Sequence, residues 1–316
     1  MKLLLSFLLL VSFGSAGAAY PDKPVKVVQA FAAGGGSDIL LRAILPRFSE
    51  YLGQPVVPDY RTGANGNVAM EAVARAPADG YTLLMGFPGL AVNPSLYENM
   101  TVQPLRDFAP VGLIGSVPNV LVIHPSVPAN SVRELVELLK KQPGKLNYAS
   151  PGSGSTQHLA AELFRLTAGV EMTHIPYKGG GQAQTDVVGG QAQMMFNVLP
   201  SALPLIKAGK LKALAVADTK RSAALPDVPT MIESGVAGHT ATTWNGLLAP
   251  AATPREVVAK LNDALVRALR TQETADALAK LGQDIAPSTP EAFGAFLREE
   301  TEKWQKVIKA TGVKAQ

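Results

Sequence analysis

One local pattern recurs along the chain and constrains its fold: a short apolar strand, a loop of small residues and the start of an amphipathic helix. The clearest example lies in residues 146–159, where a short strand leads into a glycine- and serine-rich loop and Ser155 can cap the following helix. The same order recurs at 25–31, which leads through three glycines into a helix opened by Ser37. Strands that alternate with helices favour a mostly parallel sheet, so we expect an α/β protein.

Each of these loops has the properties of an anion-binding site. Small residues let a ligand approach the backbone, and the first turn of a helix offers unpaired N–H groups at the positive end of the helix dipole. Ser155 can serve as a helix cap and as a donor to an anion, or as a cap alone. Asp38 can cap its own helix or turn toward a ligand amine or a bound water. Two such sites in one chain suggest one ligand, such as a carboxylate, held from both sides.

Ser155 and His158 are three residues apart at a helix start, which raises a hydrolase as an alternative. Neither a Gly-x-Ser-x-Gly motif nor an acid that would orient the imidazole is evident, so we favour His158 as a polar residue lining a pocket. His158 and Glu162 lie one turn apart and could bind a metal. No third ligand is apparent, so a hydrogen-bonded pair is favoured. The glycine loops match no nucleotide-binding motif, and we expect neither a metal nor a cofactor.

A third glycine loop follows Lys178 and precedes another helix. Lys178 could assist in binding a carboxylate or could be solvated, and Asp186, further along, is expected at the lip of the pocket or between lobes. Tyr177 and Phe31 could form apolar walls, although core packing is the default for both. Asn197 lies at the end of a strand, where open α/β sheets bind ligands.

The first 19 residues have the organisation of a signal peptide. Lys2 precedes an apolar run over 3–13 and a segment of small residues, and we expect cleavage after Ala19 or Ala18. The apolar run is shorter than the roughly 20 residues of a membrane-spanning helix. The chain contains no cysteine, which excludes a lipid-anchored lipoprotein, disulfides and cysteine nucleophiles. We therefore expect export to the periplasm.

The remaining chain of about 297 residues is long enough for two lobes. Two long apolar strands, 109–124 and 244–250, could cross between the lobes and form a hinge. We assign 20–118 to the first part of lobe 1, 119–245 to lobe 2, and 246–316 to the return to lobe 1 with the C-terminal helices. Because 29 basic residues face 25 acidic ones and no basic patch contains aromatic residues, nucleic acid is not expected as a partner.

The chain resembles the solute-binding receptors of tripartite tricarboxylate transporters, often called the Bug receptor family. The matching runs are 31–38, 63–67, 79–84, 93–97, 148–159, 176–181, 225–230 and 244–246. Their order and spacing together are specific, and the resemblance covers essentially the whole chain. The sequence departs from the family pattern at Ala30 and Thr62, where proline is frequent. It also departs at Asn197, where aspartate is common, and this change bears on preference at the far end of the pocket.

The resemblance implies a two-lobed periplasmic binding protein of type II-like fold, with mostly parallel sheets and a two-strand hinge. Such receptors close around a small carboxylate and deliver it to membrane permease subunits. Their loops corresponding to 31–38 and 150–158 hold the carboxylate through backbone N–H groups, small hydroxyls and ordered waters. The candidate ligand-binding residues are Phe31, Ala32, Gly36, Ser37, Asp38, Ser150, Ser153, Ser155, Thr156, His158, Tyr177, Lys178, Asp186 and Asn197.

We expect a monomeric receptor without enzymatic activity. Ligands within the family range over dicarboxylates, tricarboxylates, amino acids and aromatic acids, so the identity of the carboxylate stays open. A sensor subunit that signals its closed form to a membrane kinase is one alternative, and a periplasmic hydrolase is another.

Overall fold

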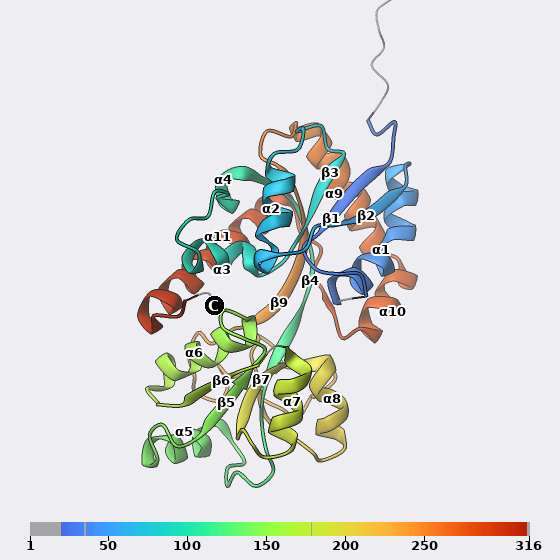
Figure 1. Cartoon of the computed structure of the whole chain (residues 1–316). Coiled ribbons are helices and arrows are strands. Elements are labelled where there is room, and N and C mark those ends of the chain that lie inside the picture. Colours follow the sequence, from blue (N-terminus) through green and yellow to red (C-terminus); the bar gives the residue numbers. More distant parts are fainter. Residues whose placement is uncertain (1–19, 35, 178, 315–316) are drawn as a thin grey trace, which may run out of the picture.

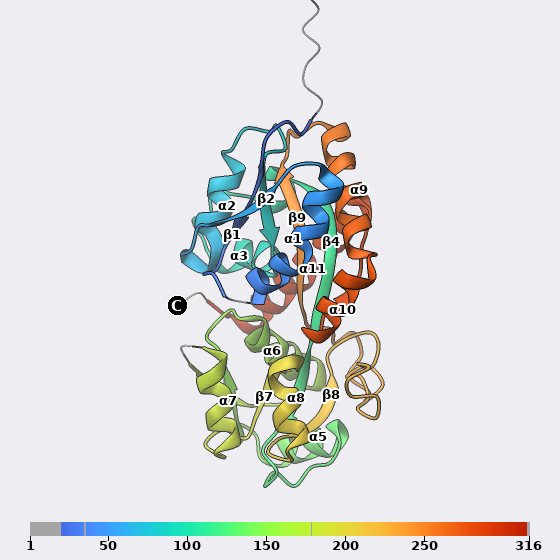
Figure 2. The same ribbon diagram turned by 90° about the vertical axis from the view of Figure 1, so that its right-hand side faces the viewer.

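The structure is a computed structural model that describes residues 20–34, 36–177 and 179–314. The expected signal peptide, residues 1–19, lies outside the described residues. The molecule consists of two lobes, and in each of them helices pack on a central sheet (Figures 1 and 2). The α/β, two-lobed architecture expected from the sequence is confirmed.

The first lobe, at the top of Figure 1, has a sheet of six strands. These are β1 (Val25–Gln29), β2 (Val56–Tyr60), β3 (Thr82–Gly86), β9 (Thr242–Pro250), β10 (Asp284–Ile285) and the first part of β4 (Phe108–Ile123). Its helices are α1 (Gly36–Leu52), η1 (Ala64–Gly66), α2 (Asn67–Ala74), α3 (Gly89–Leu96), α4 (Pro104–Asp107), α9 (Arg255–Leu269), α10 (Gln272–Lys280) and α11 (Pro290–Thr311). Buried side chains such as Leu41, Phe48 and Leu265 join α1 and α9 to this sheet.

The second lobe, at the bottom of Figure 1, repeats the layered arrangement on a smaller scale. Its strands are β5 (Asn147–Ser150), β6 (Thr173–Pro176), β7 (Met194–Val198), β8 (Lys212–Val216) and the last part of β4. Its helices are α5 (Val132–Lys141), α6 (Thr156–Ala168), α7 (Gly180–Val188) and α8 (Leu199–Lys207). Ser131 caps α5, because its hydroxyl oxygen accepts a hydrogen bond from the backbone N–H of Glu134 at 3.1 Å, as the capping box predicts.

The pairing of the strands explains how the lobes are joined. The parallel pairs form between strands that are connected through helices. In the first lobe β1 pairs with β2 and β3, and in the second lobe β5 pairs with β6 and β7. The antiparallel pairs all involve β4 or β9. Residues 108–118 of β4 pair with β9 in the first sheet, and 119–123 pair with β7 in the second. The chain therefore leaves the first lobe along β4 and returns to it along β9.

One hydrophobic cluster extends through both lobes. It includes Leu84 in the first lobe, Tyr148 and Phe164 in the second, and Trp304 in α11. Helix α11 packs against α3 of the first lobe and α6 of the second, so it covers the junction between them. Its apolar stripe is buried at Phe293, Leu297, Trp304, Val307 and Ile308, while Phe296 is partly buried.

Candidate functional site

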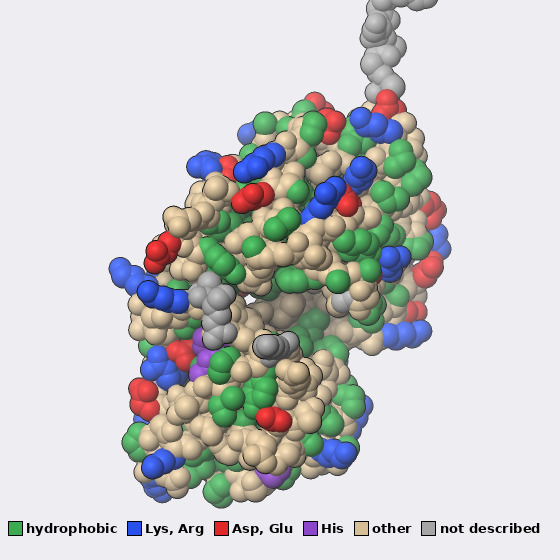
Figure 3. All heavy atoms as spheres, viewed as in Figure 1, with side chains coloured by type: hydrophobic (Ala, Val, Ile, Leu, Met, Phe, Trp, Pro, Cys, Tyr) green, Lys and Arg blue, Asp and Glu red, His purple; other side chains and the backbone are tan. Residues whose placement is uncertain are grey.

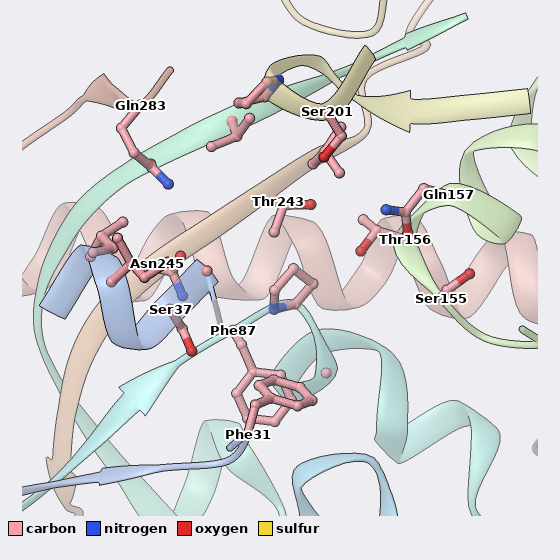
Figure 4. Close-up of a pocket in the computed structure, with 18 of the residues that line it drawn as sticks. Phe31, Ser37, Phe87, Ser155, Thr156, Gln157, Ser201, Thr243, Asn245 and Gln283 are labelled. Carbon is pink, nitrogen blue, oxygen red and sulfur yellow. The ribbon is translucent and has the colours of Figure 1, made fainter. Parts of the chain in front are cut away.

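A cavity of about 430 Å³ lies between the two lobes. The space-filling view shows the surface hollowed at this level (Figure 3), and Figure 4 shows side chains on the cavity wall. The wall is formed by the starts of α1, α3, α6 and α8, by the paired strands β4 and β9, and by the segment between α10 and β10. The volume falls in the range of about 300–1,000 Å³ that is typical of small-molecule sites.

The start of α1 forms part of the wall on the side of the first lobe. The chain leaves β1 at Gln29 and turns through Gly34, whose φ of 81° is the left-handed conformation that favours glycine. Ser37 lies on the cavity wall and donates a hydrogen bond from its hydroxyl to Oε1 of Gln29 at 3.2 Å. This bond holds the Ser37 side chain beside the first-turn N–H groups of α1.

Asp38 is buried behind this turn and is not part of the cavity wall. Its carboxylate accepts hydrogen bonds from the backbone N–H of Gly34 at 2.8 Å and from the hydroxyl of Tyr60 at 2.7 Å, and it pairs with Arg42 at 3.0 Å. Burial opposes ionisation of Asp38, but these hydrogen bonds outweigh that effect and lower its pKa. Asp38 therefore stabilises the loop that precedes its own helix.

The start of α6 forms the wall on the side of the second lobe. Ser155 is the N-cap, as predicted: its Oγ accepts a hydrogen bond from the backbone N–H of His158 at 3.2 Å and donates one to the carbonyl of Gly152 at 2.8 Å. Thr156 and Gln157, in the first turn, also line the cavity (Figure 4). The unpaired N–H groups and the positive end of the α6 dipole thus lie at the cavity.

His158 does not line the cavity, in contrast to the role expected for it. The side chain is buried, and its Nδ1 accepts a hydrogen bond from the backbone N–H of Gly154 at 3.0 Å. Its ring stacks on that of His174, with centroids 4.0 Å apart, and the nearly parallel ring of Tyr148 lies beside this pair, 4.8 Å from His174 and 6.1 Å from His158. Burial and the neighbouring His174 lower the pKa of His158 to about 3. His158 therefore supports the α6 loop from behind.

The predicted hydrogen-bonded pair of His158 and Glu162 is not formed. Nδ1 of His158 is occupied by the loop, and Glu162 accepts a hydrogen bond from the hydroxyl of Tyr148 at 2.6 Å and pairs with Arg165 at 3.0 Å. Gly154, Arg165 and Tyr148 thus take the polar atoms through which His158 and Glu162 would have paired. Within the described part of the chain, no group of three or more acidic and histidine side chains could hold a metal ion.

Three other candidates from the second lobe bond to neighbouring side chains of that lobe. Tyr177 donates a hydrogen bond from its hydroxyl to Asp186 at 2.6 Å. Asn197 is buried and donates from Nδ2 to Oε1 of Gln184 at 2.6 Å. None of Tyr177, Asp186 and Asn197 lies on the cavity wall.

The remaining candidates differ in their placement. Ser150 is buried, and its Oγ lies 2.7 Å from Nε2 of His174. Ala32 is exposed and Ser153 is half-buried. None of these three residues lines the cavity. Lys178 lies outside the described residues. The candidates on the cavity wall are Phe31, Gly36, Ser37, Ser155 and Thr156.

Asn65 lines the cavity although it was not among the predicted site residues. Both Ala64, with φ of 45°, and Asn65, with φ of 50°, adopt a left-handed conformation that is strained for residues other than glycine. Asn93 holds this turn: its Nδ2 donates to the carbonyl of Asn65 at 3.0 Å and to Oδ1 of Asn67 at 2.8 Å, and its Oδ1 accepts from Nδ2 of Asn65 at 3.0 Å. In the sequence, only the family resemblance of the run 63–67 could have indicated that Asn65 belongs to the site.

Polar residues from distant segments complete the wall. They are Gln157, Ser201, Thr243, Asn245 and Gln283 (Figure 4). The sequence pointed to Asn245, in the run 244–246, and to the segment of Gln157, in the run 148–159, whereas Ser201, Thr243 and Gln283 are brought to the wall only by the packing of the lobes. No Lys, Arg, Asp or Glu belongs to the wall as far as the described residues define it.

Two α/β lobes joined by paired strands, with a small-molecule cavity between them, define the class of two-lobed solute-binding proteins. Residues 40–313 match the model of the tripartite tricarboxylate transporter family receptor, and the chain belongs to this family. The family resemblance and the fold class predicted from the sequence are therefore confirmed. Among the described residues, no helix is both long and apolar enough to cross a membrane.

Three similar proteins illustrate the family. BugT of Bordetella pertussis is 36% identical over 297 residues, which cover 93% of this chain and 91% of BugT. The structure of R. palustris Rpa4515 with adipate has a TM-score of 0.79 at 37% identity, covering 93% of this chain and 99% of that one. MatC from Rhodopseudomonas palustris with bound malate has a TM-score of 0.75 at 33% identity, covering 92% of this chain and 100% of MatC.

Proposed function

We propose that this chain is a periplasmic receptor that captures a small carboxylate between its lobes and delivers it, chemically unchanged, to the membrane subunits of a tripartite transporter. One observation carries the proposal: α1 and α6 belong to different lobes and both start on the wall of the same cavity. The adipate and malate in the structures of two relatives support a carboxylate as the ligand. Membership of the receptor family supports the transporter as the partner.

The carboxylate binds between the two helix starts. First-turn N–H groups of α1 and α6 donate hydrogen bonds to its oxygens, and the two helix dipoles stabilise its charge. Ser37 and Thr156 add hydroxyl groups, and Phe31 shields the site from water through its edge-to-face contact with Phe87. Within the part of the chain that the structure describes, the wall offers neither lysine nor arginine, and charge-assisted hydrogen bonds to N–H groups are strong enough to stabilise an anion there.

Binding is coupled to closure of the lobes. The β4–β9 pairing is interrupted between Pro110 and Gly112 and between Leu113 and Gly115, and such irregularities let paired strands bend. A ligand that touches both helix starts contacts both lobes only when they approach, so it shifts the population toward the closed form. The membrane subunits then recognise the closed receptor.

The test is calorimetric binding to the protein purified without residues 1–19, unfolded and refolded to remove co-purified ligand. A panel of mono-, di-, tri- and aromatic carboxylates is titrated, and the ligand recovered afterwards is checked by mass spectrometry for chemical change. We expect Ser155→Ala to weaken binding of the best acid by about 1 kcal/mol or more, since the hydroxyl that fixes Gly152 and the first turn of α6 at the cavity is lost. Thermal stability also falls, because the substitution removes the cap of α6.

Ser131→Ala is the matched control. It removes the equivalent cap of α5, which lies away from the cavity, so it lowers stability by a similar amount without changing affinity. Unchanged affinity in Ser155→Ala would remove Ser155 from the binding site. Absence of binding by every acid in the panel would contradict the proposed function, and conversion of the bound acid would contradict a purely receptor role.

A further inference from the structure

The cavity is elongated, and its two ends differ in chemistry. Figure 4 places Ser155 and Gln283 far apart on the wall, with Thr243 and Ser201 between them. When the carboxylate lies between the starts of α1 and α6, the wall around Gln283 is left for the other end of the ligand.

Gln283 is fixed in place by its neighbours. Its backbone N–H donates to the carbonyl of Leu278 at 3.0 Å, and the adjacent Gly282 packs so closely on Pro200 that a Cβ at that position would lie 2.7 Å from Cγ of Pro200. Oε1 of Gln283 is buried and has no hydrogen-bond partner among the described residues, while the amide nitrogen points toward the open space in Figure 4. Gln283 therefore offers an uncommitted amide to a ligand.

The hydroxyl groups of Ser201 and Thr243 are also available at this part of the wall. Neither forms a hydrogen bond to another side chain or to the backbone within residues 20–34, 36–177 and 179–314. Apolar surface lies between these polar groups and comes from Val198, Pro200 and Leu281. The far part of the cavity is thus an apolar passage with neutral hydrogen-bonding groups.

A second ionised carboxylate is poorly accommodated here. The wall has no Lys or Arg among the described residues that could balance the charge of a second carboxylate. Helix α8 starts nearby, but Pro200 in its first turn has no backbone N–H, so this helix start offers one donor fewer. Asp284, next to Gln283, lies close enough to Asp218 to contribute to raising the pKa of Asp218, after the larger effect of burial. Asp284 also pairs with Lys220 at 3.7 Å, so this lysine is already balanced and leaves no surplus positive charge for a second anion.

We infer that the receptor selects monocarboxylates with an apolar body and a neutral hydrogen-bonding group at the far end, and that Gln283 recognises this group. The inference rests on the proposed carboxylate receptor function. This selectivity for monocarboxylates distinguishes the chain from receptors that bind acids with two carboxylates.

Two series of matched acids test the inference by calorimetry at pH 7.5. The aliphatic series is hexanoate, 6-hydroxyhexanoate and adipate, and the aromatic series is benzoate, 4-hydroxybenzoate and terephthalate. In the series that binds, we expect the hydroxy acid to bind at least about tenfold more tightly than the diacid, because the diacid buries an unbalanced charge. A diacid that binds as tightly as the hydroxy acid overturns the inference and leaves the receptor function intact.

Variants of Gln283 test the assignment of the residue. Gln283→Leu should weaken the hydroxy acid about fivefold, as loss of one hydrogen bond does, and leave the unsubstituted acid within about twofold of its original affinity. Gln283→Lys should raise affinity for the diacid at least about tenfold by placing a cation at the far end. If neither variant changes the relative affinities, Gln283 does not recognise the ligand. Thermal midpoints establish that both variants are folded.

If none of these acids binds while other carboxylates of the wider panel do, the inference fails and the receptor function stands. If no carboxylate of any kind binds, both fail together.

Discussion

His158 and His174 lie face to face behind the ligand loop, with ring planes only 7° from parallel. Burial lowers the pKa of both, and for His158 the pKa falls to about 3. The charged groups nearest this stack are Glu162, which is hydrogen-bonded to Tyr148, and Arg165. The folded protein therefore keeps the stack neutral at pH values where a free histidine begins to take up a proton.

This arrangement predicts a loss of stability in acid. Below the ordinary histidine pKa of about 6.5, the unfolded chain binds protons that the folded chain does not. The free energy of unfolding should therefore fall as the pH drops from about 7 to about 4, by up to about 1.4 kcal/mol per pH unit for each such histidine. Urea unfolding at a series of pH values measures the slope.

His158→Asn separates titration from hydrogen bonding. Asparagine keeps an acceptor for the backbone N–H of Gly154 but cannot be protonated in this range. We expect the free energy of unfolding to depend less steeply on pH than in the parent protein. The decrease in slope should correspond to about one bound proton, or about 1.4 kcal/mol per pH unit. An unchanged slope would show that His158 is not a source of the acid sensitivity.

At the scale of elements, local signals predicted most boundaries. Ser131, Ser155 and Thr289 each cap a helix through their own side chain, because a cap depends on residues within one turn. Thr253 precedes α9 but does not cap it: the helix begins at Arg255, Pro254 takes the cap position, and the buried hydroxyl of Thr253 has no partner among the described residues. The two-residue strand β10 was not predicted, since it exists only through its pairing with β4.

The turn 63–67 illustrates an element stabilised from outside. Asn93 is fully buried and supplies three hydrogen bonds to Asn65 and Asn67, which hold two strained residues in place. We expect Asn93→Ala to destabilise the protein by about 2 kcal/mol or more, because buried polar groups lose their partners. Urea unfolding measures the loss, and calorimetry should show weaker binding of the carboxylate because Asn65 lines the cavity.

Asn65→Gly is the matched comparison for this turn. Glycine adopts a positive φ without strain, so this variant should be destabilised less than Asn93→Ala although it also removes a side-chain hydrogen bond. Equal losses in the two variants would argue against strain as a significant part of the energetics.

At the scale of the whole molecule, the lobes share a core. Trp304 in α11 is fully buried in the cluster that includes residues of both lobes, and its Nε1 donates to Glu300 at 2.9 Å. We expect Trp304→Ala to lower the free energy of unfolding by about 3–5 kcal/mol, because a large cavity forms. Unfolding should remain one transition, with the same midpoint by far-UV circular dichroism and by fluorescence of the remaining Trp244.

Two separate transitions in the parent protein or in Trp304→Ala would contradict a shared core. They would indicate that each lobe unfolds independently and that α11 belongs energetically to only one of them.

The predictability of the site also depends on scale. The starts of α1 and α6 could be predicted, because a strand, a glycine loop and a helix cap are adjacent in sequence. The far end could not, because Ser201, Thr243 and Gln283 come from three distant segments that meet only through the return of β9 and the contact of Gly282 with Pro200. His158 was expected on the cavity wall because its place in the first turn of α6 does not show that His174 stacks on it.

The sheet order β3-β9-β4 has a consequence for how the protein is made. The ribosome releases β3 and β4 early, then the whole of the second lobe, and only then β9, which must enter the space between them. Until that strand arrives, the edges of β3 and β4 that β9 will cover are open to pairing with other chains. The lobe whose synthesis begins first is therefore the last to be completed.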